Sequence, residues 1–547
     1  VLNSSTVAFI LIISTIEKRY ELNSSLTGLI SASYDISFCI LALFVSFFGE
    51  RGHKPRWLAF SAFMLGLGSL IFSLPHFREL NLKQYQLARW ESEGRCLALC
   101  LSDTCQIPGT RSVNFTCSAS GVSSLSNYLY VFILGQLMLG VGGTPLYTLG
   151  TTFIDDSVAK HKSSLYIGIG YAMSLLGPAV GYVLGGQLLN IYIDIEIPES
   201  TKMDPDDPRW LGAWWIGFLV CFVATWPLII PFSCFPKYLP GKHLTIMDYI
   251  RRVLFYFWPR PSNGSMILSA KFFFLQQYVI LVKNPVLMSL IVASTSEALV
   301  ATGFATFLPK LIENQFGKTS SFSATLAGIL SRYSEIVFLY FLACPVRLSH
   351  QGCRSNHCLI VTISYSFFLT GMLHNLTAPC NANCGCSRSI YYPVCGRDEV
   401  QYFSPCFAGC ASLVINKMKK VLHSIMTANM VSVSGKCPTQ CKLLPLFLTF
   451  FFFTVVFTFM AVTPTTVAIL SSYMLLCFLG TIPGPILFGV AIDSSCTLWD
   501  INDCNTKGAC WVYDNERMAY LLMGISKWLL HIKYMYSVID ILTWTAT

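Results

Sequence analysis

Four ionisable residues lie within or beside long apolar stretches of the sequence, where burying a charge is costly. Asp35 lies in SASYDISFC, Glu297 lies in STSEALVATGFATFLPK, which ends in Lys310, and His76 lies in SLPHF. Asp35, Glu297 and Lys310 could bind a charged solute. Alternatively, the two acids form structural hydrogen bonds and Lys310 reaches the membrane surface. Histidine changes charge near neutral pH, so His76 is a candidate proton sensor; the alternative is that it caps a helix end.

The apolar stretches that must position these residues are too long for a soluble core. Hydrophobic residues make up 54% of the 547 residues and charged residues 12%, a composition that favours a polytopic, all-α membrane protein. Nearly complete spans are predicted at residues 26–48, 57–74, 128–153, 165–189, 213–235, 285–308, 443–461 and 467–492, and weaker spans at 322–346, 358–373 and 518–530. Residues 1–13 are too short to span; they predict the end of an incomplete first helix and lack the pattern of a signal peptide.

Basic residues gather in two connecting segments, GERGHKPR at residues 49–56 and residues 237–283. Because lysine and arginine are enriched in cytoplasmic loops, we expect both segments to face the cytoplasm and residues 75–127, 190–212 and 374–442 to lie outside. The net charge of +9 then follows from topology, and we expect a lipid bilayer as partner and no nucleic acid.

Most of the 22 cysteines lie in segments predicted to be outside the cell. Clusters on one side of a membrane indicate disulfides formed in an oxidising compartment. Histidines with zinc-ligand spacing are missing from these loops, so we expect no metal site. Sequons predict glycans at Asn114 and Asn375. The main group of expected disulfide cysteines comprises Cys380, Cys384, Cys386, Cys395, Cys406 and Cys410.

Motifs of enzymes and ATPases are missing from the sequence. The GKT of residues 317–319 lacks the earlier glycine of a phosphate-binding loop, and neither a nucleophile elbow nor HExxH occurs. We therefore expect no enzyme and no cofactor. Glycine and proline cluster inside spans in GVGGTP (140–145), GPAVGYVLGG (177–186) and GTIPGP (480–485). These clusters favour a carrier whose halves rock, although helix packing alone would also explain them.

The segment DDPRWLGAWWIGFL, residues 206–219, leads from charged residues into an apolar span. Indole rings favour the membrane–water interface, so we expect its tryptophans there. The segment resembles the signature of the organic anion transporting polypeptides, the solute carrier organic anion transporter family. The matching residues are Asp207, Arg209, Trp210, Gly212, Ala213, Trp214, Trp215 and Gly217.

Other blocks carry the same resemblance. CNANCGCSRSIYYPVCGRDEVQYFSPCFAGC, residues 380–410, is similar to the Kazal-type module in the fifth outer loop of this family, and TIEKRYEL and LWDINDCNTKGACW resemble further family blocks. The sequences of these blocks are most similar to those of the kidney-type branch of subfamily four. The sequence departs from the family pattern after Leu330, Cys410, Leu470 and Ser526, which suggests a truncated or mis-spliced chain.

The resemblance implies a major facilitator fold of twelve helices in two halves, of which about eleven and a remnant of the first are visible in the sequence. The implied regions are a first transmembrane half (1–235), a cytoplasmic central loop (236–284), the first part of the second half (285–373), a disulfide-rich, Kazal-like extracellular loop (374–442) and the last part of the second half (443–547).

The resemblance also implies sodium-independent uptake or exchange of amphipathic organic anions at the plasma membrane by alternating access. Expected substrates are steroid conjugates, thyroid hormone and cardiac glycosides. A counter-anion such as bicarbonate or glutamate and a basolateral location in epithelium are also expected. The alternatives are a membrane receptor or channel, or a tethered Kazal-type protease inhibitor.

An amphipathic anion needs an apolar cavity and one or two cations placed for its acidic group. Lys310 matches a family motif position and is the expected cation. Asp35 and Glu297 would tune its field or pair with it between cycles, and Phe304 and Phe307 would supply apolar wall. The resemblance further implies that His76 makes transport respond to outer pH.

Overall fold

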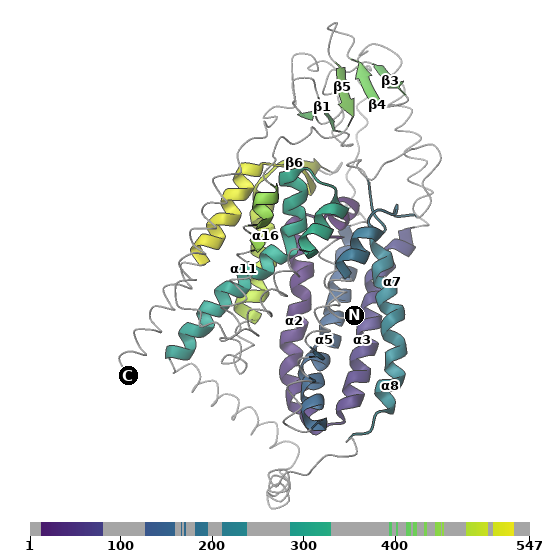
Figure 1. The fold of residues 1–547 in the computed structure, drawn as a ribbon, viewed down its shortest axis with the longest axis vertical. Coiled ribbons are helices and arrows are strands. Elements are labelled where there is room, and N and C mark those ends of the chain that lie inside the picture. The colour runs from purple at the N-terminus through teal and green to yellow at the C-terminus, as the bar shows by residue number, and fades with distance from the viewer. Residues whose placement is uncertain are drawn as a thin grey trace, which may run out of the picture.

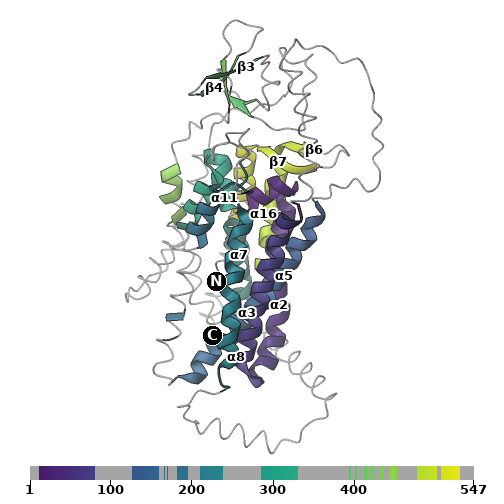
Figure 2. The same ribbon diagram turned by 90° about the vertical axis from the view of Figure 1, so that its right-hand side faces the viewer.

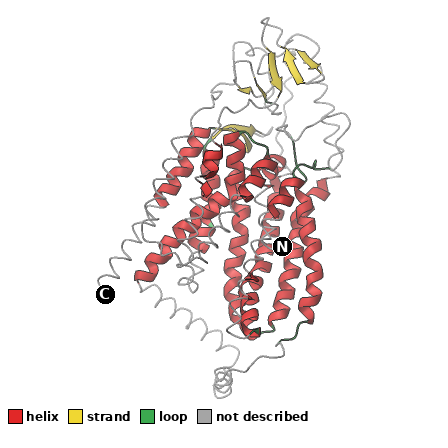
Figure 3. Cartoon of the chain, in the orientation of Figure 1, coloured by secondary structure: helices red, strands yellow, loops and turns green. Residues whose placement is uncertain are grey.

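The computed structural model describes residues 12–79, 126–158, 181–194, 210–237, 285–329, 477–501 and 507–529, with short pieces between residues 166 and 170 and between 393 and 452. The described part is mainly helical, and two small sheets lie at one end of the helices (Figures 1 and 3). This arrangement agrees with a polytopic helical protein.

A first group of helices comes from the N-terminal part of the chain and begins with a helix over residues 12–20. It continues with α2 (Ser24–Arg51), α3 (Lys54–Glu79), α5 (Leu129–Ser157), α7 (Trp214–Thr225) and α8 (Ile229–Cys234). A Cβ atom on Gly140 of α5 would collide with Tyr34 of α2, and one on Gly142 would lie 2.8 Å from Leu65 of α3. The GVGGTP cluster therefore lets helices approach closely, which is the plainer of its two explanations.

A second group comes from the C-terminal part. It contains α11 (Pro285–Phe316), the π-helix η4 (Cys477–Thr481), α16 (Pro483–Ser494) and helices over residues 320–329 and 515–529. A Cβ on Gly303 of α11 would overlap the Phe488 ring of α16. The two groups meet near the sheets, and α11 diverges from α2 toward the opposite end (Figure 1).

The strands form two antiparallel sheets. β1 (Val394–Cys395), β2 (Gln401–Tyr402), β3 (Ser412–Asn416), β4 (Lys419–His423) and β5 (Val431–Ser434) form the first, in the order β2-β1-β5-β4-β3. These strands lie within the segment that was expected to form the outer loop at residues 374–442. β6 (Cys496–Ile501) and β7 (Lys507–Tyr513) form a separate ribbon that directly follows α16 (Figure 2).

Five described helices are long and apolar enough to cross a membrane, judged by length and composition. They contain the candidate spans Ser24–Ser46, Lys54–Phe77, Leu129–Ser157, Trp214–Cys234 and Ile291–Phe316. These coincide with predicted spans. The expected span at 467–492 corresponds in its described part to η4 and α16, and the one at 518–530 to the helix over 515–529. The expected spans at 165–189, 322–346, 358–373 and 443–461 lie wholly or partly outside the described residues.

Candidate functional site

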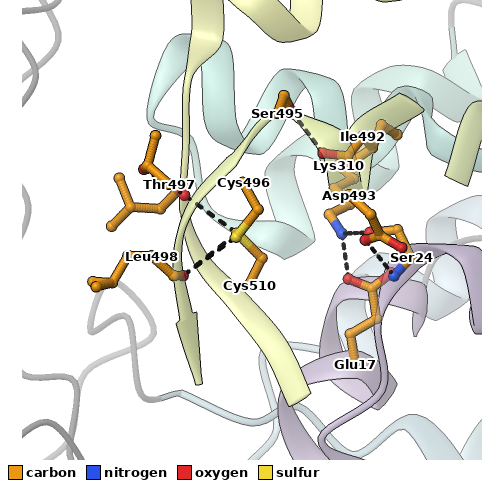
Figure 4. Close-up of a disulfide and its surroundings, with 11 residues drawn as sticks. Glu17, Ser24, Lys310, Ile492, Asp493, Ser495, Cys496, Thr497, Leu498 and Cys510 are labelled. Atoms are coloured by element: carbon orange, nitrogen blue, oxygen red, sulfur yellow. Dashed lines mark hydrogen bonds and ion pairs between the residues drawn. A yellow bond between two sulfur atoms is a disulfide. The ribbon is translucent and has the colours of Figure 1, made fainter. Parts of the chain in front are cut away.

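Helix α11 carries four of the residues that the sequence suggested for substrate binding. Glu297, Phe307 and Lys310 are all buried, at 7%, 2% and 4% exposure. The ring of Phe304 packs edge-on against Phe488 of α16, with ring centroids 5.1 Å apart. Phe307 belongs to an apolar cluster that contains residues of both helix groups, and Phe304 packs against it. The helix places its one buried lysine at the end near the β6–β7 ribbon (Figure 4).

The Lys310 ammonium is paired inside the protein. It forms an ion pair with Glu17, from the helix over residues 12–20, and donates a hydrogen bond to Ser24 Oγ at 2.6 Å. Glu17 is itself 4% exposed and accepts a hydrogen bond from Thr27 Oγ1 at 2.8 Å. Glu17 and Thr27 belong to the first helix group and Lys310 to the second. The pair therefore links the two groups (Figure 4).

The β6–β7 ribbon covers this ion pair. The Tyr513 ring centroid of β7 lies 4.9 Å from Lys310 Nζ, and the Tyr513 side chain hydrogen-bonds with Lys310 and Ser24. Burial raises the pKa of Tyr513 to about 12, so its phenol stays protonated at neutral pH. The Cys496–Cys510 disulfide joins the two strands beside the pair.

A small cavity of about 20 Å³ lies next to the ion pair. Such a volume holds about one water molecule and is far smaller than the several hundred Å³ that a drug-sized ligand needs. Lys310 therefore pairs with Glu17 in this structure, and the cavity beside the pair has no room for an organic anion. The cavity is lined by Ser14, Glu17, Lys18, Lys310, Glu313, Asn314, Ala509, Cys510, Trp511 and Tyr513.

The two expected acidic partners of Lys310 lie elsewhere. Glu297 is thirteen residues earlier on α11, roughly 20 Å along the helix axis at 1.5 Å per residue. Asp35 is half-buried on α2, and its side chain hydrogen-bonds with that of Thr481 in η4. Asp35 of the first helix group thus contacts the second group, and Lys310 of the second group contacts the first. Neither Asp35 nor Glu297 is the ion-pair partner of Lys310 in this structure, since that partner is Glu17.

His76 lies on the last turns of α3 and is 7% exposed. Its imidazole stacks on the Trp215 indole of α7, with ring centroids 4.5 Å apart and ring planes 12° apart. Phe77 packs edge-on against the same indole at 5.3 Å. The histidine is thus in direct contact with the family-like signature, a connection that the sequence did not suggest.

The described part of the signature anchors the chain segment that precedes it. Trp210 Nε1 donates to the carbonyl oxygen of Leu189 at 2.8 Å, and Trp215 Nε1 donates to that of Ile193 at 3.0 Å. A Cβ on Gly212 would lie 2.6 Å from Leu189 Cα, so a larger residue would disturb this contact. Ala213 is fully buried. A Cβ on Gly217 would lie 3.8 Å from Leu188 Cδ1, an ordinary van der Waals distance.

Trp214 of the signature packs inside the protein. It is 2% exposed, because the rings of Tyr20, Phe72 and Phe132 surround it at centroid distances of 5.9 to 6.3 Å. Contacts between aromatic rings hold this indole in place, and the level of the tryptophans relative to the membrane–water interface stays a prediction.

The outer cysteines and sequons are described only in part. Cys395 of β1 takes part in a disulfide. Among the described residues, no cluster of histidine, cysteine and acidic side chains could hold a metal ion. The predicted residues that lie outside the described part of the chain are Cys380, Cys384, Cys386, Cys406, Cys410, Asn114, Asn375, Asp207 and Arg209.

Sequence reasoning missed Glu17, Asp493 and Tyr513, which complete the environment of Lys310. Glu17 stands in the block TIEKRYEL and Asp493 directly follows a predicted span. The position of Glu17 and Asp493 at the ends of apolar spans is the signal that could have identified both as candidate site residues. Their partners are almost 300 and more than 400 residues away in the sequence, a distance that no local pattern bridges.

Comparison with known sequences identifies the family. A model of the Organic Anion Transporter Polypeptide (OATP) family matches residues 3–337 and 330–518. Solute carrier organic anion transporter family member 4C1 of Rattus norvegicus is 53% identical over 569 residues, covering 94% of this chain and 76% of the relative. The member of that name from Homo sapiens is 52% identical, covering 94% and 75%.

Solved structures show the fold. A D-xylose-proton symporter matches with a TM-score of 0.51 at 9% identity, covering 99% of this chain and 94% of the symporter. The inward open conformation of the xylose transporter XylE from E. coli matches with a TM-score of 0.50 at 9% identity, covering 98% and 94%. The fold is therefore that of a major facilitator-like transporter, and the chain belongs to the organic anion transporter polypeptide family.

Proposed function

We propose that this chain carries amphipathic organic anions across the plasma membrane by alternating access, without sodium and in exchange for a counter-anion such as bicarbonate or glutamate. Steroid conjugates, thyroid hormone and cardiac glycosides are the proposed substrates, and the basolateral membrane of epithelium is the proposed location. Family membership supports transport of organic anions. The proposed substrates, counter-anion, sodium independence and location rest on the family resemblance, and the proposed roles of Lys310 and His76 rest on the contacts around them.

The observation that carries the proposal is the position of Lys310, a buried cation between two helix groups. An alternating-access carrier needs its binding charges where both halves meet. Lys310 lies there, and in this state Glu17 supplies the carboxylate that neutralises it. We propose that a substrate anion replaces Glu17 when the adjoining end opens, with Phe304 nearby as apolar wall.

His76 is the proposed sensor of outer pH. Its ring stacks on Trp215, and an imidazolium stacked on indole gains a cation–π interaction that a neutral ring lacks. Protonation would add a positive charge near the proposed outer mouth and raise the local concentration of anions. Asp35 and Glu297 are proposed to tune the electrostatic field along the path, each from within an apolar helix.

The test is uptake of a labelled steroid sulfate by cells that express the chain at the surface. A carrier gives uptake that saturates with substrate and is unchanged when choline replaces sodium. Uptake that rises linearly to high concentration would indicate a channel instead. Surface expression with binding but no uptake would indicate a receptor.

A further inference from the structure

Asp493, at the C-terminal end of α16, caps the N-terminus of α2, a helix of the other group. Its two carboxylate oxygens accept hydrogen bonds from the backbone amides of Ser24 and Ser25, each at 2.8 Å. These amides belong to the first turn of a helix and have no partner within it. A carboxylate there also interacts favourably with the helix dipole. Asn23 caps the next amide, that of Leu26, from within α2 itself.

Two ion pairs join the same two groups close to this contact. Glu17 pairs with Lys310, and Lys18 Nζ lies 2.8 Å from Glu313 Oε1. All four charged groups come from the helix over residues 12–20 on one side and from α11 on the other. The Glu17–Lys310 pair is almost completely buried, at 5% side-chain exposure for both partners.

Close backbone packing brings the groups together at this level. A Cβ on Gly28 of α2 would collide with the carbonyl of Pro485, and one on Gly489 of α16 would collide with that of Ser24. One turn deeper, Ser31 of α2 and Thr306 of α11 have their hydroxyl oxygens 3.5 Å apart. Farther along α2, Phe44 and Phe48 are 55% and 54% exposed. The contacts of α2 with the second group thus lie along its first half. The helix that begins at residue 181 contacts that group separately, where Ser321 Oγ donates to the Gly186 carbonyl at 2.7 Å.

We propose that Asp493, Glu17 and Lys18 form an outer gate, which their partners Ser24, Ser25, Lys310 and Glu313 complete. The gate closes the proposed path at the end that carries the β6–β7 ribbon, opposite the basic segment at residues 49–56. This inference rests on the proposed alternating-access function. When that end opens, the two α2 amides and five charged side chains must exchange protein partners for water or substrate.

Asp493 determines how strongly the gate holds, because it makes two charge-assisted hydrogen bonds at once. Its loss leaves both α2 amides uncapped only while the gate is closed, since water reaches them when the gate is open. Substitution therefore raises the free energy of the closed state relative to the open state. Asn23 caps α2 from within one group, so its loss affects both states alike.

The test is a measurement of access from outside. Ser31→Cys places a reporter thiol behind the gate, and a membrane-impermeant maleimide is applied to intact cells. The labelling rate is taken as the difference between chains with and without the reporter. Asp493→Asn should speed labelling roughly tenfold or more, the population change that one or two lost charge-assisted hydrogen bonds support. Asn23→Ala, the matched control, should leave the rate within roughly twofold.

The ion pairs provide a second, independent set of variants. Lys18→Glu should speed labelling, and Lys18→Glu combined with Glu313→Lys should return the rate toward that of the unmodified chain. Lys54→Glu is the control, since Lys54 pairs with Asp156 at 2.6 Å within the first group at the opposite end. If Asp493→Asn fails to reach the surface, the charge exchange between Lys18 and Glu313 tests the gate in its place.

Equal labelling rates in Asp493→Asn and Asn23→Ala, or no recovery in the charge exchange, would overturn the gate. Labelling needs no substrate, so this result is separate from that of the uptake assay. Faster labelling together with absent steroid sulfate uptake would leave the gate in place and reject the proposed substrate class.

Discussion

Lys310 is both a buried residue of the folded protein and the cation of the proposed anion site. It is buried at 4% exposure and paired with Glu17. A lone charge left by removal of one partner of a buried ion pair costs roughly 3–5 kcal/mol. Any substitution of Lys310 therefore affects stability as well as the proposed anion site, and the two effects must be separated by design.

Lys310→Ala is expected to lower both the surface amount and the uptake of steroid sulfate, because Glu17 is left buried and charged. Adding Glu17→Gln removes that charge, so the double variant should recover much of its surface amount while uptake stays low. Surface biotinylation and uptake, measured on the same cells, give the uptake per amount of protein at the surface. Uptake that recovers in step with the surface amount would make Lys310 a folding residue only.

His76→Gln is expected to flatten the dependence of uptake on outer pH between about pH 8 and about pH 5.5, the range in which histidine changes charge. Glutamine retains a hydrogen-bonding side chain but takes up no proton. A sulfated substrate is required because it remains ionised throughout. His53→Gln, at the start of α3 on the proposed cytoplasmic side, is the control and should keep the full response. A curve for His76→Gln that matches the unmodified chain would remove His76 from the mechanism.

At the scale of elements, the sequence predicted the helices well and their partners poorly. Long apolar runs determined the spans now described as α2, α3, α5, α7 with α8, and α11, because only a helix satisfies its own backbone in lipid. The same runs say nothing about which helix contacts which. The pairing of Lys310 with Glu17, and of Asp493 with the start of α2, follows from three-dimensional packing. In this state the neighbours of Lys310 are Glu17 and Ser24, and its pairing with Asp35 or Glu297 between cycles stays a prediction.

The β6–β7 ribbon is an element whose stability should depend on pH through Asp500. Burial raises the pKa of Asp500 from 3.8 to about 6, with the nearby Glu21 carboxylate adding to the effect and a hydrogen bond with Trp511 opposing it. A carboxyl group whose pKa is higher in the folded state favours folding when protonated. Its contribution is full below the ordinary pKa and is lost as pH rises through about 6.

Asp500→Asn should therefore remove the loss of ribbon stability between about pH 4.5 and about pH 7. The measurement is hydrogen exchange of the β6 and β7 backbone amides in purified protein, corrected for intrinsic exchange rates. Protection should fall with rising pH in the unmodified chain and stay level in the variant. Glu516→Gln changes an exposed acid that follows β7 in the chain and should behave like the unmodified chain. Parallel pH dependence in all three proteins would show that Asp500 does not control the ribbon.

At the scale of the whole molecule, α2 meets the second helix group along its first half, and α11 diverges from α2 beyond it (Figure 1). The groups are joined by ion pairs, a helix cap and glycine contacts, and one buried apolar cluster contains residues of both groups. Aromatic rings also pack within each group, as for Phe72 against Phe132 and Phe304 against Phe488. Polar contacts between two groups can be exchanged for water, as alternating access requires at a gate.

The most direct test of exchange by alternating access is trans-stimulation in proteoliposomes that contain the purified chain. Labelled steroid sulfate outside is taken up into vesicles preloaded with bicarbonate, glutamate or unlabelled steroid sulfate, or left empty. At least one preloaded anion should speed initial uptake severalfold over empty vesicles, because a loaded carrier returns with its counter-anion. Equal initial rates in all preloaded and empty vesicles, with uptake otherwise intact, would contradict exchange.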